Sequence, residues 1–548
     1  MVQEIERERV MHKLLEAQAA KYGGRTFMYY KDKEFSFEEV NNLGNRVASG
    51  LQKLGITKGD KVAVVLDNCP ETVFLVFGLS KLGAIQVPIN TAHKGDIMTY
   101  MLAQSDSQMM VTHNHYLDRL RSALASIPKI QSVVLLEGSG SDQKLASGEA
   151  NVAMVGSQIG ALGKQVLEWS GFIDNDGKYR PADVIWSDPF MILYTSGTTG
   201  LPKGVVLPQN LLYAAAERFS NGTLDVGEND CIHNSLPLFH AHAWHSAVNL
   251  ALISGARFVL IERFSASKFW EENKQYGCSY AVTIRGMISI LNAANPRPDD
   301  TDNPVKIFMG GPAPQEYCEA FEQRFGVRIV DFYGSTELSA PIINQIGNRK
   351  IGSCGRVHPD FAVKIVNDNG VDVEINTPGE ILIRPIKPYE VMLEYYKMPE
   401  ETVEAWRDAW FHTGDNGFFD EDGFLIYTDR KKDVIRRRGE NISSFVLENV
   451  INSHPDVLEA AVFGVKSELG EEDVMVCLAF VQGHRITPED ITAFCEERMA
   501  KFMIPRYMRF VDELPKTPVH RVEKYKLRTE GVTADTWDRE RSGNTLKR

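Results

Sequence analysis

The stretch Tyr194-Thr195-Ser196-Gly197-Thr198-Thr199-Gly200-Leu201-Pro202-Lys203-Gly204 decides how the rest of this chain is interpreted. It follows an apolar run at residues 190–194, which predicts a buried strand that opens into a loop. Gly197 and Gly200 let backbone N–H groups turn toward a bound anion. The hydroxyls of the stretch add donors, and its lysine adds a point charge that suits phosphate. We expect an anion-binding loop; the alternative is a flexible surface turn.

The pattern differs from a Walker A loop, because Pro202 precedes the lysine and Gly204 follows it. The ten residues TSGTTGLPKG instead resemble the phosphate-binding signature of the adenylate-forming (ANL) superfamily, which includes acyl-CoA synthetases, firefly-type luciferases and adenylation domains. The resemblance runs from about residue 20 to Arg528. The string Leu66-Asp67-Asn68-Cys69-Pro70-Glu71 is similar to the acyl-CoA ligases that act on crotonobetaine and carnitine, and we expect its role to be structural.

Length and composition are those of a globular protein of two or more domains. The chain has 548 residues, 43% hydrophobic content and a formal net charge of −13, which argues against a nucleic-acid partner. Seven scattered cysteines without a CxxC pair indicate reduced thiols. No run reaches the ~18 apolar residues of a membrane span. A cytoplasmic protein is the expectation, and a homodimer is compatible with the sequence.

Helix-like and strand-like segments alternate along the chain. Ser36 and Glu39 have the spacing of a capping box at the start of a helix, and short apolar runs at residues 61–66, 84–89 and 132–136 predict buried strands. Residues 138–181 break this rhythm and predict a surface excursion. The fold class is therefore α/β, with doubly wound sheets covered by helices in a large N-terminal domain. We expect that domain at residues 1–431 and a small, mobile α+β lid at 432–548.

The polar turns that follow several strands carry the expected ATP site. In open parallel sheets, ligands bind at the ends of strands where such turns lie. The resemblance implies that Glu337 binds Mg²⁺ with help from Thr198, that Gly310, Gly311 and Pro312 lie along adenine, and that Asp415 binds the ribose. The full expected ATP/AMP-binding set is Thr195, Ser196, Gly197, Thr198, Thr199, Lys203, Gly310, Gly311, Pro312, Tyr333, Gly334, Thr336, Asp415 and Arg430.

Two segments are candidates for the acyl pocket. Pro237-Leu238-Phe239-His240-Ala241-His242-Ala243-Trp244-His245 resembles a family motif whose rings, here His240 and Trp244, wall the acyl channel. Its three histidines also raise the possibility of zinc, but no cysteine or carboxylate completes a ligand set nearby. Arg285 and Gly286 stand where relatives carry an apolar turn. Arg285 either grips a second carboxylate of the substrate or turns outward to a surface acid.

The C-terminal part carries the expected hinge and CoA-binding loop. Lys432 stands at the family's hinge position, and rotation there would let one cleft present an adenylating face and then a thiolating face. The run Ile435-Arg436-Arg437-Arg438-Gly439-Glu440-Asn441 resembles the loop beside the pantetheine tunnel. Its arginines either neutralise CoA phosphates or form a solvated basic run. The expected CoA-binding residues are Arg436, Arg438, Gly439 and Glu440.

The last family motif departs from its usual form. Relatives carry Gly-Lys where this chain has His520-Arg521, and that lysine contacts the carboxylate and the α-phosphate during adenylation. Arg521 keeps the positive charge but presents a planar fork. Lys524 is the alternative, and slow adenylation is a third outcome. The expected catalytic set is Arg521, Lys524, Glu337, Thr195 and His240.

The resemblance, carried by these motifs in family order, implies an ATP-dependent acid–CoA ligase. ATP converts a carboxylate into acyl-AMP and pyrophosphate, and CoA then gives acyl-CoA and AMP, so ATP, Mg²⁺ and CoA are the expected cofactor and co-substrates. A short, medium or polar-tailed acid is the expected substrate, with a carnitine-like acid or a dicarboxylate as candidates. The alternatives are an adenylating enzyme that loads a separate carrier protein and a nucleotide-binding protein with impaired adenylation.

Overall fold

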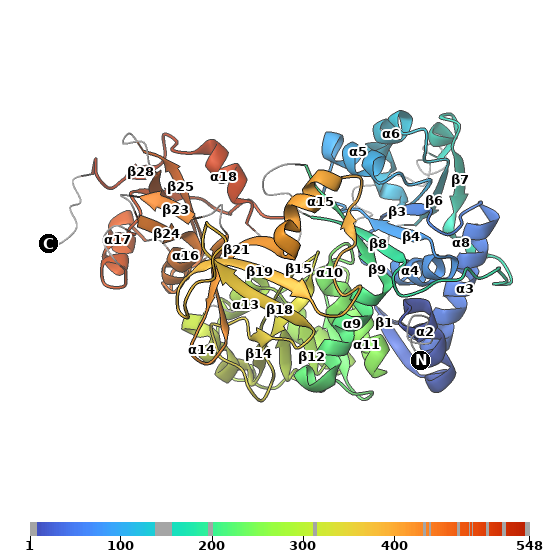
Figure 1. Cartoon of the computed structure of the whole chain (residues 1–548), viewed down its shortest axis with the longest axis horizontal. Helices are drawn as coiled ribbons and strands as arrows, with labels where there is room; N and C mark the ends of the chain where they lie inside the picture. Colours follow the sequence, from blue (N-terminus) through green and yellow to red (C-terminus); the bar gives the residue numbers. More distant parts are fainter. Residues whose placement is uncertain are drawn as a thin grey trace. The chain divides into compact units, whose positions relative to one another are not determined.

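The computed structural model describes residues 8–137, 156–195, 201–310, 315–430, 434–437, 440–467, 472–481, 483–484, 486–499, 503–517 and 522–542 (Figure 1). The chain forms two compact units. The first unit consists of Met1–Val282, Gly334–Ala340 and Lys387–Glu404. The second consists of Thr283–Tyr333, Pro341–Ile386 and Ala405–Arg548. The α/β class expected from the sequence is confirmed. Among the described residues, no helix combines the length and apolarity needed to cross a membrane.

An eight-stranded sheet forms one half of the first unit. Its order is β20-β9-β8-β4-β3-β5-β6-β7. The pairs within β8-β4-β3-β5-β6-β7 are parallel, whereas β9 runs antiparallel to both β8 and β20. The strands are β3 (Lys61–Val65), β4 (Ile85–Pro88), β5 (Met109–His113), β6 (Ser132–Leu136), β7 (Gln165–Glu168), β8 (Pro189–Tyr194), β9 (Gly204–Pro208) and β20 (Glu394–Tyr395). The sequence predicted a surface excursion at residues 138–181. This prediction is wrong for β7, which pairs with β6 and extends the sheet.

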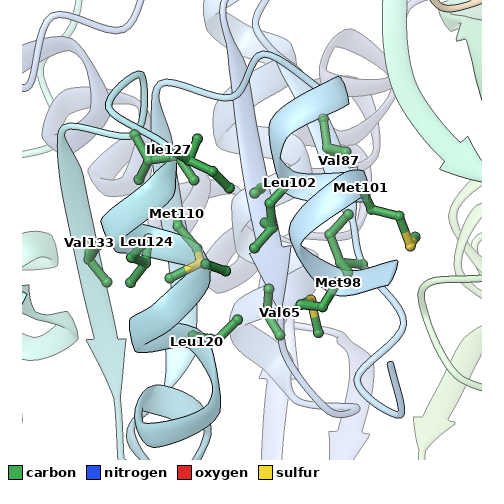
Figure 2. Close-up of a cluster of buried hydrophobic side chains, with 14 of the residues drawn as sticks. Val65, Val87, Met98, Met101, Leu102, Met110, Leu120, Leu124, Ile127 and Val133 are labelled. Atoms are coloured by element: carbon green, nitrogen blue, oxygen red, sulfur yellow. The ribbon is translucent and has the colours of Figure 1, made fainter. Parts of the chain in front are cut away.

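Helices α5 (Gly95–Gln104) and α6 (Leu117–Ser126) cover one face of this sheet, as Figure 2 shows. Met98, Met101 and Leu102 of α5 pack with strand residues such as Val65 and Met110, and all are buried. β3 and β5 are buried along nearly their whole length because both faces of the sheet are covered. The buried strands hold the polar loops that follow them in place.

Five further strands of the first unit form a second sheet in the order β12-β10-β11-β1-β2. The Ser36–Glu39 capping box is confirmed: the Ser36 hydroxyl accepts from the Glu39 N–H at 3.1 Å, and the Glu39 carboxylate accepts from the Ser36 N–H at 2.7 Å. The strands are β1 (Thr26–Tyr30), β2 (Lys33–Ser36), β10 (Cys231–Asn234), β11 (Arg257–Leu260) and β12 (Tyr280–Val282). The remaining helices and turns are α2 (Met11–Tyr22), α3 (Phe37–Lys53), α4 (Pro70–Leu82), η1 (Asn114–Tyr116), α8 (Trp169–Ile173), α9 (Gln209–Phe219), η2 (Ser220–Leu224), α10 (Ala241–Ala243), η3 (Trp244–Val248), α11 (Asn249–Ser254), α12 (Phe269–Tyr276) and α15 (Pro399–Ala405).

The second unit is built from smaller sheets. β18, β19, β21 and β22 form an antiparallel sheet in that order, and β25-β26-β27-β28 form a mixed sheet. Its helices are α13 (Arg285–Asn292), α14 (Gln315–Phe325), η4 (Arg407–Ala409), α16 (Ser444–Asn452), α17 (Pro488–Glu496) and α18 (Lys524–Glu530). Its strands are β13 (Ile307–Met309), β14 (Arg328–Val330), β17 (Arg356–Val357), β18 (Phe361–Val366), β19 (Gly379–Pro385), β21 (Phe411–Phe419), β22 (Leu425–Arg430), β23 (Val434–Arg437), β24 (Glu440–Ser443), β25 (Val457–Lys466), β26 (Glu472–Phe480), β27 (Tyr507–Phe510) and β28 (Trp537–Asp538). β15 (Phe332–Ser335) and β16 (Ser339–Ile343) carry the chain between the units.

Candidate active site

The glycine- and hydroxyl-rich loop joins the two antiparallel strands β8 and β9, with Tyr194 opposite Gly204. The Thr195 N–H donates to the Lys203 carbonyl at 3.0 Å, and the Lys203 N–H lies 3.4 Å from the Thr195 hydroxyl. These bonds close the base of the loop. Its tip, Ser196, Gly197, Thr198, Thr199 and Gly200, lies outside the described residues. Thr195 and Lys203 are therefore the part of the expected phosphate loop that the structure places.

Glu337 lies in a tight turn between β15 and β16. Thr336 precedes it in the same turn, and both side chains are half-buried. Gly334 makes the turn feasible, because a Cβ atom there would stand 1.7 Å from the Ser339 carbonyl oxygen. Only glycine fits so close an approach of backbone to backbone. The turn thus presents a carboxylate, the hard oxygen ligand that Mg²⁺ prefers.

Tyr395 connects Glu337 to the phosphate loop within the first unit. The Tyr395 hydroxyl donates to Oε1 of Glu337 at 2.9 Å, and the Lys203 ammonium lies 4.7 Å from the centre of the Tyr395 ring. β20 pairs with β9 directly after the loop, with Tyr395 opposite Val205. Burial and the negative charge of Glu337 raise the pKa of Tyr395, so the hydroxyl stays a donor at neutral pH.

Sequence reasoning missed Tyr395. No spacing rule singles it out, because it reaches the loop through pairing of strands that are nearly 200 residues apart in sequence. The one available signal was its place in a short polar and aromatic segment after residue 393. The structure therefore brings Thr195, Lys203 and Glu337 together and adds Tyr395 to them.

Asp415 and Tyr333 form the corresponding cluster of the second unit. The Tyr333 hydroxyl donates to Oδ2 of Asp415 at 2.7 Å, and the Asp415 N–H donates to the Thr413 hydroxyl at 3.1 Å. Tyr333 is buried, and its burial, followed by the charge of Asp415, raises its pKa. The half-buried carboxylate is held in one orientation, as a group that accepts two ribose hydroxyls requires.

The other expected nucleotide residues of the second unit are placed in part. Arg430 lies opposite Asp415 in the β21–β22 ladder. Gly310 follows β13 with a φ of 100°, a conformation that favours glycine, and its N–H donates to the Val330 carbonyl at 3.0 Å. Gly311 and Pro312 lie outside the described residues. The adenine role of this segment stays a prediction.

The expected acyl-pocket residues of the first unit differ in exposure. Trp244 is fully buried, and its indole N–H donates to the Leu238 carbonyl at 2.6 Å. His240 is half-buried, and its ring centre lies 4.7 Å from that of Phe239. Burial lowers the pKa of the neighbouring His245, whose Nδ1 lies 2.9 Å from the Ser246 hydroxyl. The segment is largely buried, burial lowers the pKa of His242 as well as that of His245, and its acyl role stays a prediction.

Arg285 has partners that neither of its two expected roles anticipated. It begins α13, followed by Gly286, and its guanidinium donates to the Asn449 side-chain oxygen. The same group lies 5.0 Å from the centre of the Phe445 ring. Both partners belong to α16 of the same unit. In this structure Arg285 therefore contacts an amide and an aromatic ring of α16, and its charge also acts to lower the pKa of Glu448 on that helix.

The arginine run of the C-terminal part is not uniform. Arg437 is buried and pairs with Asp473, with Nε and Oδ1 2.9 Å apart, so it fits neither a solvated run nor a phosphate-neutralising role. Arg436 and Glu440 lie opposite Asn441 and Arg437 in the β23–β24 ladder. Arg438, Gly439 and the hinge residue Lys432 lie outside the described residues. The CoA-binding and hinge roles stay predictions.

Arg521 also lies outside the described residues, whereas its alternative Lys524 is placed. The Lys524 ammonium lies 2.7 Å from Oε1 of Glu448 and 2.8 Å from the Ser444 hydroxyl. Burial raises the pKa of Glu448, and the charge of Lys524 partly offsets this. Lys524 thus balances the negative charge of a mostly buried glutamate of α16. This structural role competes with contact to a substrate.

Comparison with known proteins gives the family. The AMP-binding enzyme family matches residues 15–396. The chain belongs to this family. The AMP-binding enzyme C-terminal domain matches residues 446–521. The resemblance to the adenylate-forming superfamily is confirmed.

Curated relatives extend the match over nearly the whole chain. The crotonobetaine/carnitine–CoA ligase of Salmonella paratyphi B is 32% identical over 527 residues, which are 93% of this chain and 97% of the relative. The enzyme of the same name from Salmonella typhi is 32% identical over 521 residues, with the same coverage of 93% and 97%. The similarity to crotonobetaine/carnitine–CoA ligases that the Leu66–Glu71 string suggested is confirmed.

Solved structures share the fold of this family member. The anthranilate CoA ligase AuaEII in complex with anthranoyl-AMP is 25% identical, with a TM-score of 0.84 over 95% of this chain and 97% of that chain. The O-succinylbenzoate coenzyme A synthetase MenE from Bacillus subtilis in complex with AMP is 26% identical, with a TM-score of 0.75 over 96% and 99%. A benzoate CoA ligase from Burkholderia xenovorans LB400, 23% identical with a TM-score of 0.81, shares the fold.

Proposed function

We propose that this chain is an ATP-dependent acid–CoA ligase. It would join a carboxylate to the α-phosphate of ATP, release pyrophosphate, and then transfer the acyl group from AMP to the thiol of CoA. The observation that carries the proposal is the triad Glu337–Tyr395–Lys203, which joins a carboxylate and an ammonium group at the base of the loop after β8. Membership of the AMP-binding enzyme family and the 32% identity to CoA ligases support it.

The residues of the first unit fit the phosphate end of ATP with Mg²⁺. Lys203 would hold the leaving pyrophosphate, with the N–H groups and hydroxyls of its loop around it. Glu337 fits Mg²⁺ because its half-buried carboxylate is a hard oxygen ligand that Tyr395 holds in one orientation. When bound, Mg²⁺ neutralises charge along the triphosphate. Tyr395 contacts both groups, with its hydroxyl on Glu337 and its ring on Lys203.

The second unit would supply the nucleoside and acyl-transfer contacts. Asp415, oriented by Tyr333, would accept the ribose hydroxyls. Arg521 would balance the charge of the reacting carboxylate and α-phosphate, because its guanidinium keeps the charge of the usual lysine. Rotation about Lys432 would exchange the adenylating face for the thiolating face. By analogy with the crotonobetaine/carnitine–CoA ligases, we favour a small carboxylic acid with a polar tail. A dicarboxylate gripped by Arg285 is not favoured, because Asn449 and Phe445 occupy that guanidinium.

The location and assembly of the enzyme are part of the proposal. Seven cysteines are present, and all seven are free and buried, which suits a reducing compartment such as the cytoplasm. A homodimer stays a prediction. Gel filtration with light scattering measures it directly.

Release of AMP tests the proposed function. The purified chain is incubated with MgATP and a panel of carboxylic acids, with and without CoA, and AMP and pyrophosphate are quantified. A ligase releases AMP in a manner that needs both the acid and CoA, and Glu337→Gln lowers that rate. AMP that forms equally without CoA would point to loading of another acceptor. No AMP with any acid would leave only nucleotide binding.

A further inference from the structure

A second cluster of ligand-type side chains lies in the first unit, apart from the residues assigned to ATP. Asp67 follows β3, His113 ends β5, and His115 lies in the short turn η1. β3 and β5 are adjacent and parallel, with Val65 opposite Thr112. Their carboxyl ends therefore meet at one edge of the sheet, the edge where parallel sheets place their ligands. None of the three residues has a task in the proposed ligase reaction.

The three side chains converge at distances that suit one metal ion. Oδ2 of Asp67 lies 3.4 Å from Nε2 of His115 and 3.9 Å from Nδ1 of His113. One ligand atom from each residue lies within 4.8 Å of the other two. Zinc bonds of ~2.0–2.1 Å in a tetrahedron place two ligand atoms roughly 3.3 Å apart. Small side-chain movements are enough to bring all three atoms into bonding distance.

Neighbouring side chains hold Asp67 in position through hydrogen bonds, as the hydrogen-bond partners of metal ligands do. The Tyr116 hydroxyl donates to Asp67 at 2.6 and 2.7 Å, and the Thr91 hydroxyl donates to Oδ1 of Asp67 at 3.0 Å. The Arg119 guanidinium lies 3.9 Å from the centre of the Tyr116 ring and fixes that ring. Hydrogen bonds to a carboxylate ligand commonly hold it in position for a metal.

The two imidazoles leave nitrogen atoms available for a ligand. Nε2 of His115 is buried, and its partner is Oδ2 of Asp67 at 3.4 Å, itself one of the proposed ligand atoms. Nδ1 of His113 lies 3.4 Å from the Asp67 N–H, at the long limit of a hydrogen bond, so a metal would displace only a weak contact. The rings are stacked, with centres 5.1 Å apart and planes 14° apart. Both rings place a nitrogen near the same oxygen, Oδ2 of Asp67.

We propose that Asp67, His113 and His115 bind a divalent transition-metal ion, with Zn²⁺ the best match, at a site distinct from that of MgATP. Two imidazole nitrogens favour zinc over Mg²⁺ or Ca²⁺, which prefer oxygen ligands. The ion would tie the end of β3 to the end of β5. It therefore stabilises this sheet without taking part in adenylation.

Metal titration of the full chain tests the site. Metal-stripped, untagged protein is titrated with Zn²⁺ by calorimetry in excess Mg²⁺ and without ATP. We expect one equivalent to bind with micromolar or tighter affinity and to raise the thermal midpoint. His115→Ala and Asp67→Asn should each weaken binding at least about ten-fold, because each removes one of three ligands. His484→Ala, at an exposed histidine paired with Asp456, is the matched control and should bind like the wild type.

Two outcomes of the titration overturn the proposal, and a third can come from Co²⁺ spectroscopy. One is the absence of saturable binding at one equivalent; the other is binding that His115→Ala leaves unchanged, which would place the ion elsewhere. Co²⁺ replaces Zn²⁺ in a second measurement on the wild type, so the test does not depend on folded variants. A tetrahedral site gives intense visible absorption bands with Co²⁺, and only the weak bands of six-coordinate Co²⁺ would contradict the assignment.

Discussion

The side chain of Tyr395 connects a carboxylate and a cation that the sequence places far apart, the carboxylate through its hydroxyl and the cation through its ring. Removing the hydroxyl with Tyr395→Phe keeps the ring beneath Lys203 but deletes the donor to Glu337. A hydrogen bond to a charged group is worth about 1.5–3 kcal/mol. We expect the KM for MgATP to rise about ten-fold or more, with a smaller change in kcat. Initial rates at varied MgATP measure both constants.

Tyr30→Phe is the matched control for that variant. The Tyr30 hydroxyl also donates to a glutamate, Oε1 of Glu262, at 2.9 Å, but on the other sheet of the first unit. It should leave the KM for MgATP unchanged. A Tyr395→Phe enzyme whose KM matches that of Tyr30→Phe would show that Glu337 needs no orientation by Tyr395.

Lys524 gives a second prediction at the scale of single residues. Lys524→Met leaves Glu448 without its cation, and removing one partner of a mostly buried pair is destabilising by about 2 kcal/mol or more. Urea unfolding measures the loss. Lys526→Met, two residues away on α18, removes an ion pair with Glu523 in which the lysine is 47% exposed, and should cost about 0.5 kcal/mol or less. Equal stability of the two variants, with adenylation lost only in Lys524→Met, would make Lys524 the adenylating cation instead.

Helix α2 carries a buried histidine that ties it to α4. Nδ1 of His12 lies 2.9 Å from the Ser80 hydroxyl, and burial, with the charges of Lys81 and Lys13, lowers the pKa of His12 to about 3. The unfolded chain takes up a proton at about pH 6.5, whereas the folded protein does so only near pH 3. Stability contributed by neutral His12 is therefore full above pH 6.5 and is lost as the pH falls toward 3.

The pH dependence of unfolding tests the contribution of α2. Between pH 7 and pH 5, the free energy of unfolding of the wild type should fall by about 2 kcal/mol more than that of His12→Gln. The reason is that each pH unit below the pKa of His12 in the unfolded chain costs the folded protein about 1.4 kcal/mol. Denaturant unfolding at both pH values measures this. An identical slope for His12→Gln would mean that His12 is not held neutral.

At the scale of the whole molecule, the two half-reactions should respond differently to the backbone at Lys432. Proline there fixes φ and removes an N–H, so it restricts rotation between the proposed faces. We expect Lys432→Pro to slow transfer from acyl-AMP to CoA at least about ten-fold, while acyl-AMP formation changes less than about three-fold. Pyrophosphate release and acyl-CoA formation are measured separately. Lys432→Ala is the control, and equal effects on both half-reactions would argue against a hinge.

The sequence by itself determined the features that depend on local pattern. The capping box of α3, the buried strands β3, β4 and β6, and the loop after β8 are each written in a few consecutive residues. Local hydrogen bonds and hydrophobic periodicity specify such elements within a short window of sequence. The family signature at residues 195–204 can likewise be recognised from consecutive residues, because a single loop of glycine and hydroxyl residues surrounds a phosphate.

The tertiary structure decided everything that depends on strand order. The pairing of β20 with β9 puts Tyr395 beside Lys203, and the pairing of β3 with β5 puts Asp67 beside two histidines. Tertiary packing likewise buries Arg437 against Asp473, although the sequence shows only a basic run. Strand order cannot be derived from local sequence patterns. Crossover connections let strands that are far apart in sequence become neighbours, and the packing of the whole sheet determines which strands pair.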